Sequence, residues 1–228
     1  MYKIDFHSHI LPGADHGSDG IETSAFQLNE AISVGINTIV ATPHFYPHRH
    51  SVDQFLQKRN AAAQILAEHI KKNDLPIDLR VGAEVLLCQG MERLPGLEKL
   101  LIEGTDTLLL ELPFSDFHRS YYDTVEEFIS RGYTVLLAHC DRYDSEIIEN
   151  MLDLGAKMQL NVSSIGKMFV KKHLKNWIND GVVYAFGSDI HGKDKNAYKI
   201  FNAALGKYSH PADTIMARSK MLLAAKSE

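Results

Sequence analysis

The sequence predicts a single α/β domain over residues 1–228, built from seven β-α units that form a closed or nearly closed barrel. Two regularities lead to this fold. First, stretches with helical spacing end at a glycine and a strand-like run follows, as at Gly35, Gly104, Gly132, Gly155 and Gly181. Glycine just past a helix supplies the left-handed cap from which the chain turns into a strand. Second, runs such as 107–110 and 134–138 are nearly all apolar, which is typical of parallel strands covered by helices.

Each element has a local signal of its own. Ser51 with Gln54 has the spacing of a capping box, and Asp19 with Glu22 has the same N-cap spacing. Behind Ser51, apolar residues keep the i, i+3, i+4, i+7 spacing of one buried helix face. In chain order, we expect strands at 2–6, 39–43, 79–83, 108–110, 135–138, 158–160 and 182–188. We expect helices at 22–34, 52–72, 121–131, 144–154, 168–180, 195–206 and 212–226, and a shorter one at 91–103.

A polar residue follows the end of every expected strand. These residues are His7 with His9, His44, Glu84, Glu111, His139, Asn161, and Asp189 with His191. Six of the seven ends therefore carry side chains that bind a divalent metal. The C-terminal ends of barrel strands meet at one face, where catalytic residues lie. The sequence predicts a metal centre there; an open doubly wound sheet is the alternative, but it brings seven strand ends together less readily.

The composition excludes several classes of protein. A net charge of -5 argues against a nucleic-acid groove, which normally carries a basic excess. No run reaches the 18 or more apolar residues of a membrane span, and the first ten residues lack the basic start and apolar core of a signal peptide. Cys88 and Cys140 lack CxxC spacing, so the sequence indicates neither a disulfide framework nor a thiolate zinc site. We therefore expect a cytoplasmic protein.

The donor types indicate which ions fit. Mixed imidazole and carboxylate ligands without thiolate suit manganese, iron or zinc in a catalytic site. Neither a GxxxxGK[ST] loop nor a GxGxxG fingerprint is present, so a nucleotide cofactor has no support.

Six short motifs, in order along the chain, resemble those of the PHP (polymerase and histidinol phosphatase) superfamily. They are 7–13 (HSHILPG), 41–44 (ATPH), 82–84 (GAE), 110–114 (LELPF), 138–142 (AHCDR) and 188–191 (SDIH). Within that superfamily the chain looks most like the bacterial tyrosine-protein phosphatases of capsule and exopolysaccharide loci. The likeness runs from about residue 2 to 225.

The resemblance implies a distorted (β/α)7 TIM-like barrel that holds three divalent transition metal ions, with manganese favoured over iron or zinc. By position, the first ion takes His7, His9, Glu84 and Asp189, the second takes Glu84, Glu111 and His139, and the third takes His16, His44 and His191. Close relatives usually have aspartate where this chain has His16. Histidine occurs at that ligand position elsewhere in the superfamily, so the third ion is retained in this expectation.

The resemblance also implies the residues that act on substrate. Arg142 matches a phosphate-holding arginine, and it joins His139 and Asp189 as the expected catalytic residues. A second arginine expected shortly after His191 is absent, and Lys193 lies there instead. Arg119 is expected to supply part of that missing phosphate contact. Lysine binds phosphate as a point charge, without the bidentate fork of arginine.

Three functions remain open from the sequence. The first is a metal-dependent phosphatase acting on the phosphorylated tail of a cognate tyrosine kinase. The second is a phosphatase of small phosphomonoesters, similar to histidinol phosphatase. The third is a non-catalytic metal-bearing scaffold. A cysteine-dependent phosphatase is excluded, because its signature places arginine six residues after the cysteine and Glu146 stands at that distance from Cys140.

Overall fold

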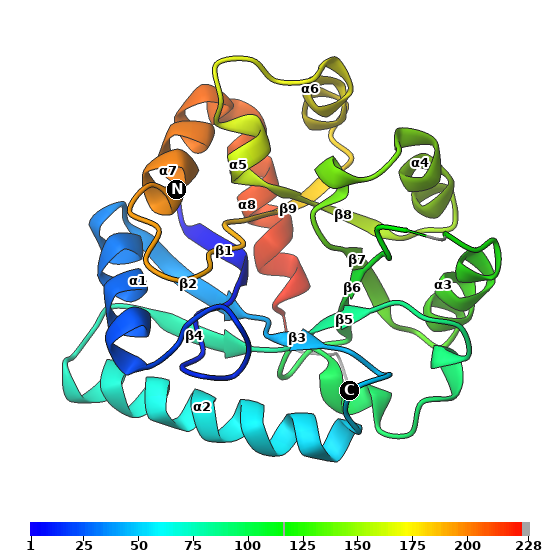
Figure 1. Ribbon diagram of the computed structural model, residues 1–228. Coiled ribbons are helices and arrows are strands. Elements are labelled where there is room, and N and C mark those ends of the chain that lie inside the picture. Colours follow the sequence, from blue (N-terminus) through cyan, green and yellow to red (C-terminus); the bar gives the residue numbers. More distant parts are fainter. Residues whose placement is uncertain (116, 225–228) are drawn as a thin grey trace.

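The strands form two parallel sheets that follow the chain order. The computed structural model describes residues 1–115 and 117–224, and Figure 1 shows the strands in the middle of the molecule with helices around them. The first sheet has the order β1-β2-β4 and the second has the order β3-β5-β6-β7-β8-β9. The strands are β1 (Lys3–Ser8), β2 (Ile36–Ala41), β3 (His44–Phe45), β4 (Asp78–Val81), β5 (Glu84–Leu86), β6 (Thr107–Glu111), β7 (Thr134–Leu137), β8 (Lys157–Asn161) and β9 (Val183–Gly187).

The strands expected at 39–43 and 79–83 end two residues early, and after a break a short strand follows each of them. Pro43 separates β2 from β3, because proline has no N–H to donate to a neighbouring strand. Gly82 and Ala83 separate β4 from β5 at the same level. Backbone hydrogen bonds bridge the break: Gly82 N–H donates to Ala41 O at 2.9 Å and Glu84 N–H donates to Pro43 O at 3.1 Å. Seven of the nine observed strands therefore overlap the expected strands, whereas β3 and β5 begin at His44 and Glu84, just past two of the expected ends.

The first and last strands meet at their C-terminal ends. Asp189 N–H donates to His7 O at 2.8 Å, and His9 N–H donates to Ile190 O at 3.2 Å. Within the described residues no strand ladder pairs β1 with β9. The two bonds bring candidate ligands from opposite ends of the chain side by side.

Most helices lie where the sequence places them. They are α1 (Ile21–Ser33), α2 (Val52–Lys72), α3 (Ser120–Ser130), α4 (Ser145–Asp153), α5 (Val162–Ile165), α6 (Lys172–Asn179), α7 (Ala197–Lys207) and α8 (Ser209–Leu222). The Ser51–Gln54 capping box is present in both directions, at 3.2 and 3.1 Å. Gly35, Gly132, Gly155 and Gly181 follow helices and have positive φ, as expected of residues that end a helix in the left-handed region, whereas Gly104 has positive φ but follows no helix.

Four expectations about helices need correction. The stretch 91–103 contains only two 3₁₀ turns, Met91–Arg93 and Leu97–Leu100, and α6 begins at Lys172 rather than at 168. The cap of α1 is Gly20, while Asp19 accepts a hydrogen bond from the Thr23 hydroxyl. The short helix α5 was not expected, and the predicted end of the last helix at 226 lies outside the described residues.

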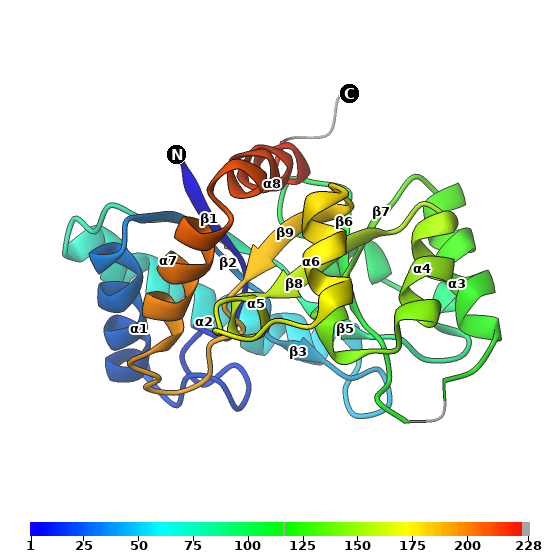
Figure 2. The same ribbon diagram turned by 90° about the horizontal axis from the view of Figure 1, so that it is seen from above.

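The helices divide the molecule into a closed end and a loop end. Viewed from above, α8 lies along one end while the loops that follow the strands lie at the other (Figure 2). At the closed end, Ser219 donates to Tyr184 O at 3.1 Å and Thr107 donates to Leu222 O at 2.9 Å. Because α8 covers the closed end, a site is accessible at the loop end. Among the described residues, no helix combines the length and the apolar character that crossing a membrane requires.

Candidate metal centre

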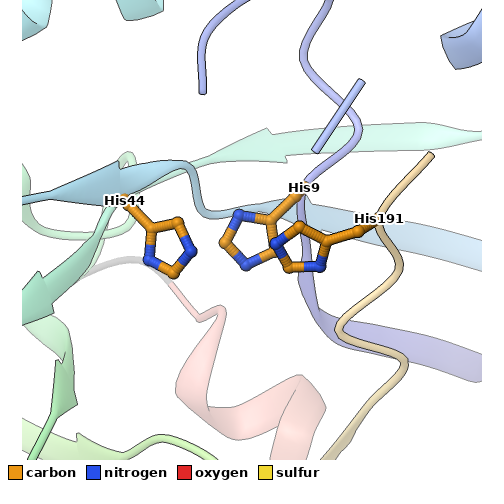
Figure 3. Close-up of side chains that lie close together, drawn as sticks. All are labelled: His9, His44 and His191. Carbon is orange, nitrogen blue, oxygen red and sulfur yellow. The ribbon is translucent and has the colours of Figure 1, made fainter. Parts of the chain in front are cut away.

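The polar residues at the strand ends form one buried cluster. His7 and His9 come from β1 and the residue after it, His44 begins β3, Glu84 begins β5, and Glu111 ends β6. His139 follows β7, and Asp189 and His191 follow β9. His7 and Glu84 are fully buried, whereas His191 is about one-third exposed at its side chain. Figure 3 shows that His9, His44 and His191, from three separate segments, lie close together.

One group of donors surrounds the Nε2 atoms of His7 and His9. These two atoms lie 3.2 Å apart, and each is 3.3 Å from Glu84 Oε2. Asp189 Oδ1 lies 3.2 Å from His9 Nε2 and 3.7 Å from His7 Nε2. Ligands held about 2.0–2.2 Å from a tetrahedral ion lie roughly 3.3–3.6 Å from one another. The four side chains therefore have the spacing of a coordination shell.

Glu84 is shared with a second group of donors. Its Oε1 lies 2.8 Å from His139 Nε2, which is also 3.6 Å from Glu111 Oε1. Its Oε2 lies 2.8 Å from His44 Nδ1, which is 3.9 Å from Glu111 Oε2. Glu84 therefore stands between two groups of donors, as a bridging carboxylate does.

The third group consists of imidazole rings. His9 lies between His44 and His191, with ring centroids 4.4 and 4.1 Å away. The ring of His16, which is exposed, lies 4.8 Å from that of His44 and 4.7 Å from that of His191. The exposed His16 ring thus lies next to the rings of His44 and His191.

Hydrogen bonds behind the cluster orient three of its rings. His9 Nδ1–H donates to Asp15 Oδ2 at 2.6 Å, and His191 Nδ1–H donates to Asp189 O at 3.0 Å. His7 Nδ1 lies 3.4 Å from Gln159 Oε1, which also accepts from the His139 backbone N–H. With these Nδ1 atoms occupied as donors, the Nε2 lone pairs are free to bind an ion, and such partners are typical of metal-binding histidines.

Asn161 and Arg142 hold Asp189 from the other side. Asn161 Nδ2 donates to Asp189 Oδ2 at 2.9 Å, and Arg142 forms an ion pair with the same oxygen. Asn161 is the strand-end residue that the sequence left outside the ligand set. Sequence reasoning also assigned no role to Asp15, in the loop after β1, or to Gln159, within β8, and no local signal marked their contacts.

The backbone is strained at two of these residues. His139 has φ 33° and Asp189 has φ 52°, in the left-handed region that residues other than glycine rarely occupy. Buried Asp5 holds the segment before Asp189, because it accepts hydrogen bonds from Ser188 N–H at 2.8 Å and Tyr198 OH at 2.9 Å. Such strain is found at active sites where the surrounding structure imposes it.

Protonation within the cluster follows from its packed charges. Burial lowers the pKa of His139, but hydrogen bonds to Glu111 and Glu84 outweigh it and raise that pKa to about 9. Burial also lowers the pKa of His9, but hydrogen bonds to Asp15, Asp189 and Glu84 outweigh burial and raise that pKa well above its ordinary value. Burial raises the pKa of Glu84, but the facing histidines outweigh it and hold that pKa well below the usual range. The carboxylates thus draw positive charge into the site.

A divalent cation fits these residues better than protons do. Glu84 Oε2 and His44 Nδ1 are buried and only 2.8 Å apart, yet neither has a hydrogen-bond partner of acceptable geometry. An unsatisfied buried carboxylate oxygen costs free energy unless a cation meets it. Imidazole and carboxylate donors without sulfur suit manganese, iron or zinc.

The expected substrate residues divide into two kinds. Arg142 lies at the site and its side chain is about 40% exposed, so its guanidinium is partly open to solvent. Arg119 and Lys193 are exposed, and neither forms a hydrogen bond or ion pair with a cluster residue in the described part of the chain. Of the aromatic residues near the site, Phe114 is 65% exposed and stacks 5.9 Å from His139.

Cys140 has the properties of a core residue. It is fully buried and free, and burial raises the pKa of its thiol above the ordinary value. A thiol of this kind is a poor nucleophile. Cys88 is also free.

Comparison with known proteins connects this geometry to a family. The model of the family "Capsular polysaccharide synthesis, CpsB/CapC" matches residues 3–217. Tyrosine-protein phosphatase YwqE of Bacillus subtilis (strain 168) is 30% identical over 201 residues, 82% of this chain and 77% of its own. Tyrosine-protein phosphatase CpsB of Streptococcus pneumoniae is 26% identical over 211 residues, 84% of each chain.

Solved structures agree on the fold. A crystal structure from work on YwqE and CpsB, described there as unique metal-dependent tyrosine phosphatases, superposes with a TM-score of 0.82 at 25% identity and covers 96% of this chain and 94% of that one. A TatD family hydrolase from Entamoeba histolytica has a TM-score of 0.56 at 11% identity, with coverage of 97% and 98%, a likeness of fold alone.

Proposed function

Because this chain belongs to the CpsB/CapC family of capsular polysaccharide synthesis, we propose that it is a metal-dependent phosphatase that hydrolyses phosphotyrosine on protein. The observation that carries the proposal is the bridging position of Glu84 between two groups of donors. Metal-dependent hydrolases commonly place two ions about 3.5–4 Å apart, where they act together on one phosphoryl group. Glu84 Oε2 lies close to His7, His9 and His44, and Oε1 lies close to His139, so both carboxylate oxygens have nitrogen donors beside them, which suits such a pair.

We assign three ion positions to the cluster, in agreement with the family resemblance. His7, His9, Glu84 and Asp189 would hold the first ion, and Glu84, Glu111 and His139 the second. His16, His44 and His191 would hold the third. Manganese is our expected ion, because a site of imidazole and carboxylate ligands accommodates it, and iron or zinc are the alternatives. When bound, the ions would generate a hydroxide nucleophile at neutral pH and neutralise the phosphate oxygens.

The protein's own contribution is position and charge. Arg142, held by Asp189 at the mouth of the site, is placed to turn its exposed guanidinium toward a phosphoryl oxygen. His139 and Asp189 have strained backbone conformations, and their side chains lie close to Glu84 Oε1 and to His9 Nε2. No side chain needs to form a covalent intermediate, in keeping with the buried Cys140. We keep Arg119 and Lys193 as secondary phosphate contacts, which are supported by their charge alone.

We infer three further properties. The seven strand positions and the two bonds between the ends of β1 and β9 support a distorted (β/α)7 barrel formed by one domain over residues 1–228. The capsule context of the family supports a phosphorylated tyrosine kinase tail as the physiological substrate. The two free cysteines support a reducing compartment, for which we propose the cytoplasm.

The test compares substrates on one manganese-loaded preparation. We expect phosphotyrosine peptides to have a higher kcat/KM than matched phosphoserine peptides and a panel of small phosphomonoesters. Arg142→Ala should lower kcat/KM while bound metal stays at the wild-type level, because Arg142 touches phosphate rather than the ions. A small phosphomonoester turned over far faster than every phosphotyrosine peptide would replace this proposal with the small-molecule phosphatase.

A further inference from the structure

A pocket of about 280 Å³ lies beside the metal centre, next to the start of α2. Asp15, His16 and His44 line its inner side. Tyr46, Arg49 and Lys58 line its outer side, from the segment after β3 and from α2. His16 and His44 belong to both the cluster and the pocket wall, so the pocket adjoins the metal centre.

The pocket carries positive charge in a protein whose net charge is -5. Arg49 and Lys58 are exposed, and neither forms an ion pair with another described residue. The one carboxylate in the wall, Asp15, is already committed. It accepts hydrogen bonds from His9 Nδ1 at 2.6 Å, His44 N–H at 3.0 Å and Gly17 N–H at 2.8 Å. Two cations therefore face the cavity without a local counter-charge.

Stacked rings connect this charge to the metal centre. The ring of Tyr46 stacks on that of His44, with centroids 5.2 Å apart and planes 18° from parallel. The guanidinium of Arg49 lies over the ring of Tyr46, 5.0 Å from the ring centroid. A cation held over an aromatic ring is restricted in its motion, so Arg49 is set in place before an anion arrives.

We propose that this pocket binds an anionic side chain of the substrate peptide, close in sequence to the phosphotyrosine at the metal centre. This inference rests on the proposed phosphatase function and specifies its substrate class. An extended peptide advances about 3.3–3.6 Å per residue. The steps from the His44 ring to the Tyr46 ring (5.2 Å) and from there to the Arg49 guanidinium (5.0 Å) together span at most about 10 Å, which is the advance of about three extended residues.

The experiment compares two phosphotyrosine peptides that differ only at the flanking positions, glutamate in one and glutamine in the other. The quantity measured is the ratio of their kcat/KM values at low salt, for the wild type, for R49Q/K58Q and for K71Q. Lys71 is the matched control, because it is an exposed lysine in the last turn of the same helix. Bound manganese is measured for each protein.

Exposed ion pairs each change affinity by up to about fivefold. We expect the wild type and K71Q to favour the glutamate peptide by about threefold to tenfold, and R49Q/K58Q to show a ratio near one with metal content unchanged. The preference should shrink as salt is added, because exposed charges are screened. Equal turnover of both peptides by the wild type, or a preference that survives in R49Q/K58Q, overturns the pocket assignment alone. No turnover of either peptide overturns the proposed function and this inference with it.

Discussion

Replacing Asp15 by asparagine tests whether the cluster is organised for metal. Asp15 touches no proposed ion, but its Oδ2 accepts the His9 Nδ1–H bond at 2.6 Å. A hydrogen bond to a charged group contributes about 1.5–3 kcal/mol, against about 1 kcal/mol for a neutral one. The substitution therefore removes about 0.5–2 kcal/mol from the correct orientation of His9. We expect manganese to bind roughly tenfold more weakly, since about 1.4 kcal/mol is a factor of ten.

The pH dependence of this effect has a definite sign. Burial lowers the pKa of His9, but Asp15 and the other carboxylates outweigh burial and raise that pKa well above its ordinary value. In the metal-free protein a proton therefore competes with the ion for His9 at neutral pH. Asparagine removes part of that increase and relieves part of the competition. The ratio of dissociation constants, variant over wild type, should therefore be largest at alkaline pH and should decrease as pH falls.

Calorimetric titration with manganese at several pH values between 6.5 and 8.5 measures the effect. Asp74→Asn serves as the control, because Asp74 is exposed and its positive φ of 48° suits asparagine. Equal affinities for Asp15→Asn and wild type at pH 8.5 would refute the reasoning, as would a ratio that grows on acidification.

Three other predictions test the site and its packing. Cys140→Ser should keep most activity, and iodoacetamide should not inhibit the wild type, because burial raises the pKa of the thiol; inhibition with metal content unchanged would reinstate a thiolate mechanism. His139→Ala and Asp189→Ala should each lower kcat by at least roughly two orders of magnitude, and a smaller loss in steady-state assays would remove these residues from the catalytic centre. Gly187→Ala should destabilise the fold by about 1–3 kcal/mol in urea unfolding, because its Cβ would lie 2.6 Å from His7 Cβ; Gly206→Ala, with no atom within 4 Å, should not destabilise it.

Local signals in the sequence were enough to locate most elements. The capping box at Ser51 and the glycines after the helices act within a few residues, so their effect is readable from the chain alone. The prediction of a helix at 91–103 was wrong because it passed over a helix-breaking residue in that stretch. The stretch 91–103 has helical spacing but contains Pro95, and it forms only two 3₁₀ turns.

Long-range contacts were outside the reach of sequence reasoning. Gln159 meets His7 across 152 positions, and Asn161 meets Asp189 across 28. Nothing near Gln159 in the sequence marks that contact, because an amide side chain within a strand has many possible partners. The same holds for Asp15, whose role depends on a loop that returns it to His9 and His44.

The sequence by itself indicated which polar residues gather in the cluster, because they follow the expected parallel strands in chain order, although His44 and Glu84 begin short strands of their own. Only the tertiary structure decided how these donors divide around Glu84, which of their nitrogens face inward, and that Arg142 reaches the cluster. It also created the cationic pocket of Arg49 and Lys58 beside His44. The physical reason is that periodicity determines the direction of a side chain on its own element, whereas distances between side chains depend on how separate elements pack.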